Sequence, residues 1–88
     1  PKEFFLFQNY PNPFNPVTKI AFEIPKKIFT TLKVFDVNGR ELKTLLSEEL
    51  NAGKYEVDFD GADNPSGVYF YRLMSGDFIN VKSMMLLK

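Results

Sequence analysis

Three aspartates in the stretch DFDGADN, Asp58, Asp60 and Asp63, come closest to a chemical motif in this chain. Carboxylates at such spacing are typical of calcium loops, and an EF-hand loop has a glycine at its sixth position and a glutamate at its twelfth. Counted from Asp58, Gly61 is only the fourth residue and Tyr69 is the twelfth. The motif therefore fails, and a turn stabilised by aspartate and asparagine side chains explains these residues equally well.

Other catalytic chemistry is excluded by what the composition lacks. The sequence has no cysteine and no histidine, which rules out thiolate chemistry, disulfides, Ser–His triads and imidazole acid–base catalysis. Glu48 and Glu49 form a carboxylate pair in a charged stretch, but catalysis by two carboxylates requires environments that separate their pKa values. We predict no enzyme activity, cofactor, metal site or small-molecule substrate.

Three consecutive aromatic residues, Tyr69, Phe70 and Tyr71, have the side chains of a sugar-stacking platform. The run VYFYRL that contains them is apolar on both faces, which is typical of a central strand and favours core packing. A sugar site also requires exposed aromatic rings beside polar partners, and the chain has no tryptophan. A carbohydrate-binding module therefore stays an alternative to the main interpretation below.

Length and charge restrict the class of protein further. The 88 residues are enough for one domain, and ten Phe and four Tyr supply large buried areas. Eleven basic and eleven acidic side chains cancel, whereas nucleic-acid and anionic-membrane binders have lopsided charge. Because the chain begins at Pro1 with no signal peptide, we expect one domain excised from a longer protein.

The elements that would position any site are strands. The run TKIAFEIP alternates, so that Ile20, Phe22 and Ile24 face one side and Pro25 ends the strand. The strongest hairpin signal is Asn38-Gly39, which predicts a two-residue turn. Further signals are a short strand at 4–7, a turn at Ala52-Gly53 before a strand with Tyr55, Val57 and Phe59 inward, and a turn at 75–77. About seven short strands predict an antiparallel Ig-like β-sandwich.

The stretch QNYPNPFNPVTKI precedes the first long strand and contains Pro11, Pro13 and Pro16. Proline fixes φ near −65° and restricts the preceding residue, which favours polyproline II. The period of three predicts three edges: Asn9, Asn12 and Asn15; Pro11, Phe14 and Val17; and Tyr10, Pro13 and Pro16. The other interpretation, which we favour for this segment, is a first strand interrupted by prolines at a sheet edge. We expect an extended lead-in over 1–17 and a sandwich body over 18–88.

Five segments in order and spacing carry a family resemblance: QNYPNPFNPVTKIAFEIP, LKVFDVNGRELKTLL, LNAGKYEVDFDG, PSGVYFYRL and VKSMMLLK. From Gln8 to Lys88 the chain resembles the type A C-terminal sorting domain of the type IX secretion system of Bacteroidetes. The resemblance implies a non-catalytic Ig-like signal that directs an N-terminal passenger across the outer membrane to the surface or the extracellular space. It also implies recognition by the translocon and the cell-surface processing machinery. The ending MMLLK fits a true C-terminus.

The resemblance also assigns residues. The family's opening motif falls on Pro11–Pro16, its glycine-aromatic motif on Gly67–Leu73 and its terminal strand on Lys82–Lys88. The motif residues are Asn12, Pro13, Asn15, Pro16, Asn38, Gly39, Gly53, Gly67, Tyr69 and Tyr71, and the recognition residues are Lys82, Met84, Leu86, Leu87 and Lys88. The middle segments are shared with Ig-like domains of flagellar hook-capping proteins and discriminate less well.

Recognition of this kind would use the folded shape together with an exposed terminal strand, which a partner's sheet can extend through main-chain hydrogen bonds. Two other functions remain open from the fold alone. One is a structural Ig-like module that packs on a neighbouring catalytic domain, and the other is the carbohydrate-binding module considered above.

Overall fold

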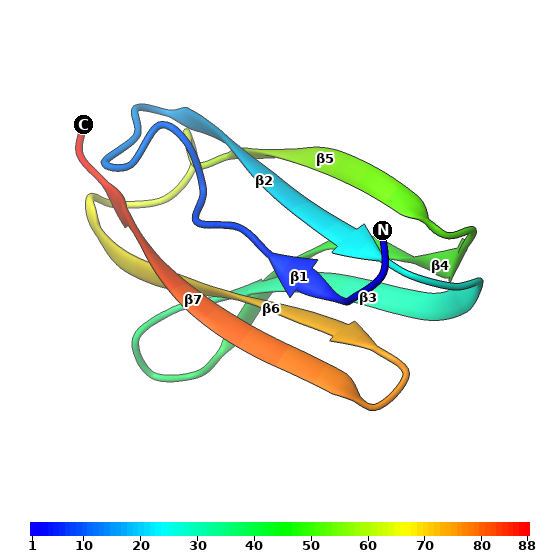
Figure 1. Cartoon of the computed structure of the whole chain (residues 1–88). Coiled ribbons are helices and arrows are strands. Elements are labelled where there is room, and N and C mark those ends of the chain that lie inside the picture. Colours follow the sequence, from blue (N-terminus) through cyan, green and yellow to red (C-terminus); the bar gives the residue numbers. More distant parts are fainter.

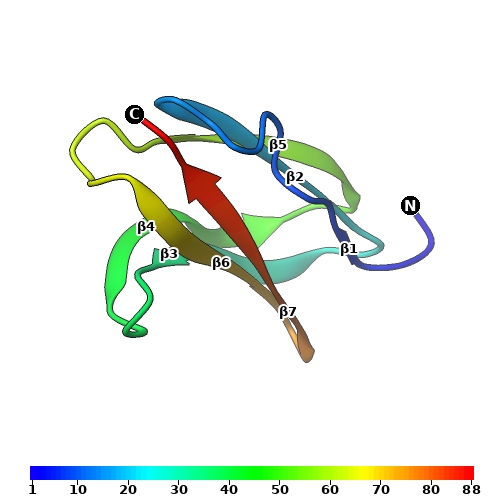
Figure 2. The ribbon, with the colours of Figure 1, turned by 90° about the vertical axis from the view of Figure 1, so that its left-hand side faces the viewer.

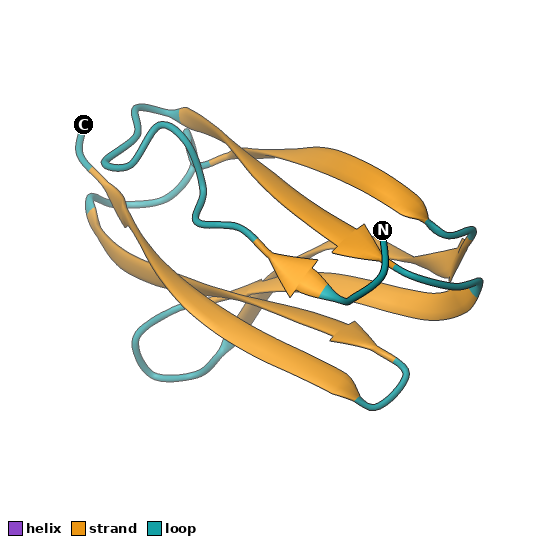
Figure 3. Ribbon diagram, viewed as in Figure 1, coloured by secondary structure: helices purple, strands orange, loops and turns teal.

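Seven strands and no helix make up the structure, a computed structural model that describes residues 1–88 (Figure 1 and Figure 3). The strands are β1 (Phe5–Leu6), β2 (Val17–Ile24), β3 (Ile28–Phe35), β4 (Glu41–Leu50), β5 (Gly53–Asp60), β6 (Gly67–Ser75) and β7 (Phe78–Leu86). Their pairings are all antiparallel. The predicted all-β fold, an antiparallel Ig-like β-sandwich of about seven strands, is confirmed.

The strands form two layers, which Figure 2 shows from the end of the sandwich. One sheet has the order β1-β2-β5, and the other has the order β4-β3-β6-β7. In a constant-type immunoglobulin domain the fourth strand lies in the sheet of the first two. Here β4 instead pairs with β3 along its whole length, because the two strands are joined as a hairpin. The four-stranded sheet therefore has β4 and β7 as its two edges.

The space between the sheets is filled by side chains that alternate along the strands. Ile20, Phe22 and Ile24 of β2 point into this space, as the period-two pattern predicted. The core consists of Leu6, Phe14, Ile20, Phe22, Ile24, Leu32, Val34, Leu50, Phe59, Tyr69, Tyr71, Leu73, Met84 and Leu86. Residues from both ends of the chain belong to it, so the ends take part in the fold.

Strand β6 lies between β3 and β7, which confirms that VYFYRL is a central strand. Tyr69, Tyr71 and Leu73 are buried on its inner side. The Tyr69 hydroxyl donates a hydrogen bond to the carbonyl oxygen of Pro65, four residues upstream, which is the tyrosine corner found in Ig-like domains. Both tyrosines therefore support the core and are not available as a sugar-stacking platform.

The turn between β6 and β7 has the predicted position. Ser75 pairs with Phe78 across a two-residue loop, and Gly76 has a φ of +59°. A glycine with positive φ at the first central position is typical of a type II′ hairpin turn, whose twist matches that of the strands.

The loop between β3 and β4 differs from the prediction of a two-residue turn. Asp36 donates its N–H to the carbonyl of Arg40, and Gly39 donates to the carbonyl of Asp36, so three residues form the loop. Gly39 has a φ of +83°, whereas Asn38 has a negative φ. The Asp36 carboxylate accepts hydrogen bonds from the N–H groups of Arg40 and Asn38. These bonds lower the pKa of Asp36 and stabilise the wider loop, a type I turn followed by a left-handed glycine.

Replacing Gly39 by valine is expected to lower the free energy of unfolding by about 1–2 kcal/mol, because a β-branched residue is strained at positive φ. A side chain at this position would meet no atom within 4 Å, so the cost comes from the backbone alone. Denaturant unfolding measures the change. Gly39→Asn is the control and should cost less, since asparagine tolerates this conformation; equal losses for both variants would contradict the explanation.

The opening segment is irregular, so the predicted polyproline II helix with three edges is wrong. Asn9 and Phe14 are buried, although the prediction placed each on an edge with residues that are exposed. Tyr10 forms a bridge with Lys19 of β2, and Phe14 forms a bridge with Leu86 of β7. Three peptide bonds are cis, those before Pro11, Pro13 and Pro16. The segment thus crosses from one sheet to the other, and the favoured interpretation, a first strand interrupted by prolines, describes it better.

Candidate recognition surface

The opening segment and the C-terminal end of β7 lie side by side at one end of the sandwich (Figure 1 and Figure 2). The N–H of Phe14 donates to the carbonyl of Met85 at 2.9 Å, and the N–H of Leu87 donates to the carbonyl of Phe14 at 3.0 Å. The Asn12 side-chain oxygen accepts the Met85 N–H at 3.0 Å, and the Gln8 amide donates to the Ser83 carbonyl at 2.7 Å. We call this surface, residues 8–14 and 83–88, the terminal junction.

The buried hydroxyl of Tyr71 on the central strand β6 holds the opening segment through two hydrogen bonds. The Tyr71 hydroxyl donates to the carbonyl of Phe7 at 2.9 Å and accepts the N–H of Asn9 at 2.8 Å. Burial raises the pKa of Tyr71 to about 12. The Asn9 side chain donates to the Thr18 hydroxyl and to the carbonyl of Pro11. The segment is therefore held by specific polar contacts in addition to the prolines.

Apolar packing closes the same end of the molecule. The buried Phe14 ring meets the Phe59 ring edge-to-face, with centroids 6.0 Å apart. Gly61 lies against this pair, and a side chain there would approach Leu86 to 3.0 Å and Phe14 to 3.3 Å. The Gly61 N–H also donates to the carbonyl of Pro16 at 2.7 Å. The opening segment and β7 thus leave little space beside Gly61, and a side chain there would force its neighbours to move by a few tenths of an ångström.

The last residue is fixed by the loop between β5 and β6. The N–H of Lys88 donates to the Ser66 hydroxyl at 2.9 Å, and its ammonium group donates to the carbonyl of Ala62. Both termini of the terminal junction are therefore hydrogen-bonded to other elements, and the surface has a defined shape.

The comparison with known families addresses the identity of this arrangement. Residues 8–87 match the family described as a secretion system C-terminal sorting domain. The chain belongs to this family. A sorting domain of this kind is the C-terminal signal for type IX secretion, and it marks its protein for export to the cell surface or the extracellular space. Its role is that of a signal attached to an N-terminal passenger and used by the type IX machinery.

Two further findings concern the chain as a whole. A comparison with curated proteins gave no match. No helix in the structure is long and apolar enough to cross a membrane.

The residues of this sorting domain that are predicted to be recognised by a partner fall into two groups in the structure. Met84 and Leu86 point inward and belong to the core, and Lys82 is half-buried. Leu87 and Lys88 are exposed. Because successive side chains of a strand alternate, Met84 and Leu86 are not available to a partner of the folded domain, whereas Leu87 and Lys88 are. The recognition role itself stays a prediction.

The predicted motif residues also lie in different places. Asn12 contacts β7 in the terminal junction, and Gly67 is paired with Leu86 beside it. Pro13 and Asn15 are exposed in the opening segment, Pro16 accepts the Gly61 N–H, and Tyr69 and Tyr71 are in the core. Asn38 and Gly39 form the β3–β4 loop, and Gly53 begins β5 at the opposite end of the sandwich. The structure therefore brings together the family's opening motif and its terminal strand, but not the middle segments of the family pattern.

Sequence reasoning missed several residues that build the terminal junction. Gln8, Asn9 and Phe14 make its contacts, and Gly61 provides the space for it. The available signal was Phe14, a large apolar residue between two Asn-Pro pairs in a segment that was otherwise polar. Such a residue is typical of an anchor that packs into a core.

The acidic stretch Asp58–Asp63 covers the end of β5 and the turn that follows it. Asp58 pairs with Lys19 across the sheet at 3.0 Å, and Asp60 accepts the N–H of Ala62 at 2.9 Å. The bond to Asp58 raises the pKa of Lys19. The structure has no group of three or more acidic side chains arranged to hold a metal ion. An exposed ion pair therefore accounts for Asp58, and turn stabilisation accounts for Asp60.

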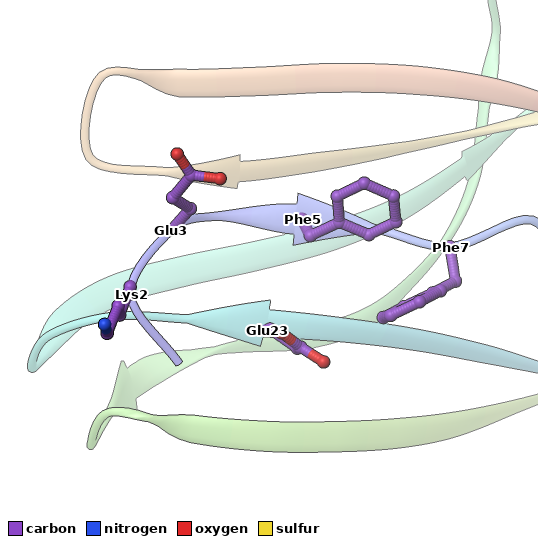
Figure 4. Close-up of a pocket in the computed structure, with 5 residues that line it drawn as sticks. All are labelled: Lys2, Glu3, Phe5, Phe7 and Glu23. Carbon is purple, nitrogen blue, oxygen red and sulfur yellow. The ribbon is translucent and has the colours of Figure 1, made fainter.

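An open hollow on the outer face of the three-stranded sheet is lined by Lys2, Glu3, Phe5, Phe7 and Glu23 (Figure 4). The rings of Phe5 and Phe7 are both exposed, with centroids 4.6 Å apart and planes inclined at 61°. Because the rings share no plane, they do not offer a flat platform to a sugar. The hollow therefore gives no support to a carbohydrate-binding function.

Proposed function

We propose that the type IX translocon and the cell-surface processing machinery recognise the terminal junction as a folded unit, through side chains that point outward from its C-terminal end. The observation that carries this proposal is the pairing of Phe14 with Met85 and Leu87. This pairing occupies the backbone edge of the last strand at residues 85–87, so a partner cannot add a strand at that end. Side chains remain as the means of recognition at this position.

The outward side chains of the C-terminal end are suited to docking. Met85 and Leu87 are apolar and exposed, and Lys88 supplies a positive charge next to them. Exposed apolar groups beside a polar rim are typical of interaction sites. The exposed residues Asn12 and Pro13 border the same surface. Residues from both ends of the chain would thus be read together, and only in the folded domain.

Leu87→Glu is expected to reduce export of a reporter fused to this domain in a type IX host at least tenfold. Leu87 is 50% exposed, so the substitution should change the free energy of unfolding by only about 0.5 kcal/mol. Lys88→Glu tests the neighbouring charge; because it also removes the bond from the Lys88 ammonium to the Ala62 carbonyl, its export is compared with its own thermal stability. Export is measured as reporter at the cell surface, and stability by thermal unfolding of the purified domain.

Val37→Glu is the matched control, since Val37 is 66% exposed on the β3–β4 loop, outside the terminal junction. It should leave export unchanged. Met84→Ala, a core substitution, separates the two explanations further. If export follows thermal stability across Leu87→Glu, Val37→Glu and Met84→Ala, the signal is only the folded state and the proposal is wrong. Retention of every fusion in the periplasm would favour a structural module instead.

A further inference from the structure

The sandwich has four strand edges, and three of them are protected against strand addition. β1 has only two residues. β5 carries the charged residues Lys54, Glu56 and Asp58. β4 carries charged residues and is interrupted by register shifts opposite Leu32 and Val34. Short strands, charges and bulges are the devices by which soluble proteins protect their sheet edges.

The fourth edge, β7, consists of two unlike halves. Ser83, Met85 and Leu87 direct backbone groups away from β6, and the opening segment binds these groups. Because the backbone alternates with a period of two, Ile79 and Val81 direct their N–H and C=O groups to the same side. No hydrogen bond in the structure reaches these groups. The half Phe78–Lys82 is therefore an uncovered edge in a strand whose other half is covered.

Two apolar side chains of this half lie on the outer face of the four-stranded sheet. Ile79 and Val81 are 58% and 50% exposed on the outer face of the sheet. They lie opposite Met74 and Arg72 of β6. The Arg72 guanidinium lies 4.8 Å from the centre of the Phe35 ring on β3. A further strand beside β7 would extend this row of side chains and bury Ile79 and Val81.

We propose that Phe78–Lys82 is a strand-docking site, at which an extended segment of a type IX component pairs with β7. Two outward-facing residues with free N–H and C=O groups form a pattern that only an extended backbone can satisfy in full. The docked segment places β-branched or aromatic side chains against Ile79 and Val81, since such cross-strand pairs stabilise sheets. The proposal rests on the sorting function of the domain but not on recognition of Leu87 and Lys88.

Val81→Pro tests the site in the reporter fusion. Proline removes the outward N–H without breaking a bond to β6, and edge strands tolerate proline at such positions. We expect export to fall at least tenfold while the melting temperature changes by only a few degrees. Val81→Lys is a second variant that leaves the backbone intact and places a charge on the edge. It should block export to a similar extent.

Glu56→Pro and Glu56→Lys are matched controls on the β5 edge. The backbone groups of the odd-numbered residues of β2 point toward β1 and the opening segment, since the carbonyls of Lys19 and Ala21 accept hydrogen bonds from that side. The even residues of β2 therefore bond to the odd residues of β5, which leaves the Glu56 N–H on the free edge. Both controls should be exported like the parent fusion.

Three results would overturn the proposal. One is normal export of a Val81→Lys domain that is folded. This result would count against the proposal even if Val81→Pro fails to fold. Another is an equal loss of export in the Glu56 variants, which would show that any edge substitution is harmful. The third is a domain dimer in sedimentation experiments that Val81→Lys dissociates, since the occupant would then be a second copy of this chain. Leu87→Glu is measured separately. If the strand-docking proposal fails, recognition of the C-terminal side chains therefore still has its own test.

Discussion

Replacing Phe14 by alanine is expected to lower the free energy of unfolding by about 3–5 kcal/mol, the usual loss for a buried phenylalanine. Phe14 is 2% exposed and packs against Phe59, Leu86 and the bare backbone of Gly61. Removing the ring leaves a cavity where the opening segment, β5 and β7 meet. A domain of this size is only marginally stable, so export of the reporter fusion should fail with the fold. Denaturant unfolding of the purified domain measures the loss.

Tyr10→Ala is the matched control for Phe14→Ala. Tyr10 lies in the same segment and is also aromatic, but it is 80% exposed. Its removal should change the free energy of unfolding by no more than about 0.5 kcal/mol. A loss in Tyr10→Ala as large as that in Phe14→Ala would mean that the whole segment, and not the Phe14 ring, supplies the stabilisation.

The strands were predictable because their pattern is local. From Ile20 to Ile24 in β2 and from Tyr55 to Phe59 in β5, every second side chain is large and apolar, and this alternation identifies the buried face. The central position of β6 followed from its apolar residues on both faces. Gly76-Asp77 supplied the turn chemistry that a hairpin requires. In these elements local preference and tertiary packing agree.

The opening segment was not predictable from local preference, because its contacts are distant in the sequence. Asn9 bonds to Tyr71, and Asn12 bonds to Met85. The backbone preferences of proline describe an isolated chain, whereas these contacts draw the segment across both sheets. In the β3–β4 loop the competing contact was close by, but it came from the Asp36 side chain and not from the Asn38-Gly39 pair.

The recognition residues at the C-terminus illustrate another limit. Met84 and Leu86 face the core, while Met85 and Leu87 face outward. A period of two defines these two faces, but each face carries one methionine and one leucine, so the pattern does not say which is buried. The pairing of Leu86 with Gly67 and its contact with Phe14 decide the orientation. The exposed pair is the face that a partner can reach.

Tyr71→Phe is expected to lower the free energy of unfolding by about 1–3 kcal/mol, because it leaves the buried N–H of Asn9 without a partner. The carbonyl of Phe7 loses its donor as well. Tyr55→Phe is the control, since the Tyr55 hydroxyl bonds to the Asn51 carbonyl at the surface and its loss should cost little. Faster exchange of the Asn9 amide hydrogen in Tyr71→Phe would locate the effect in the opening segment.

The same hydroxyl gives the domain a specific response to alkaline pH. Burial raises the pKa of Tyr71 from 10.0 to about 12 in the folded domain. Because the folded value is the higher one, the unfolded chain loses its proton first as the pH rises. The stabilisation is therefore complete below pH 10.0 and is lost as the pH rises through about 12. Thermal unfolding across this range should show the decline in the parent domain and a smaller decline in Tyr71→Phe, whereas equal declines would assign it to other groups.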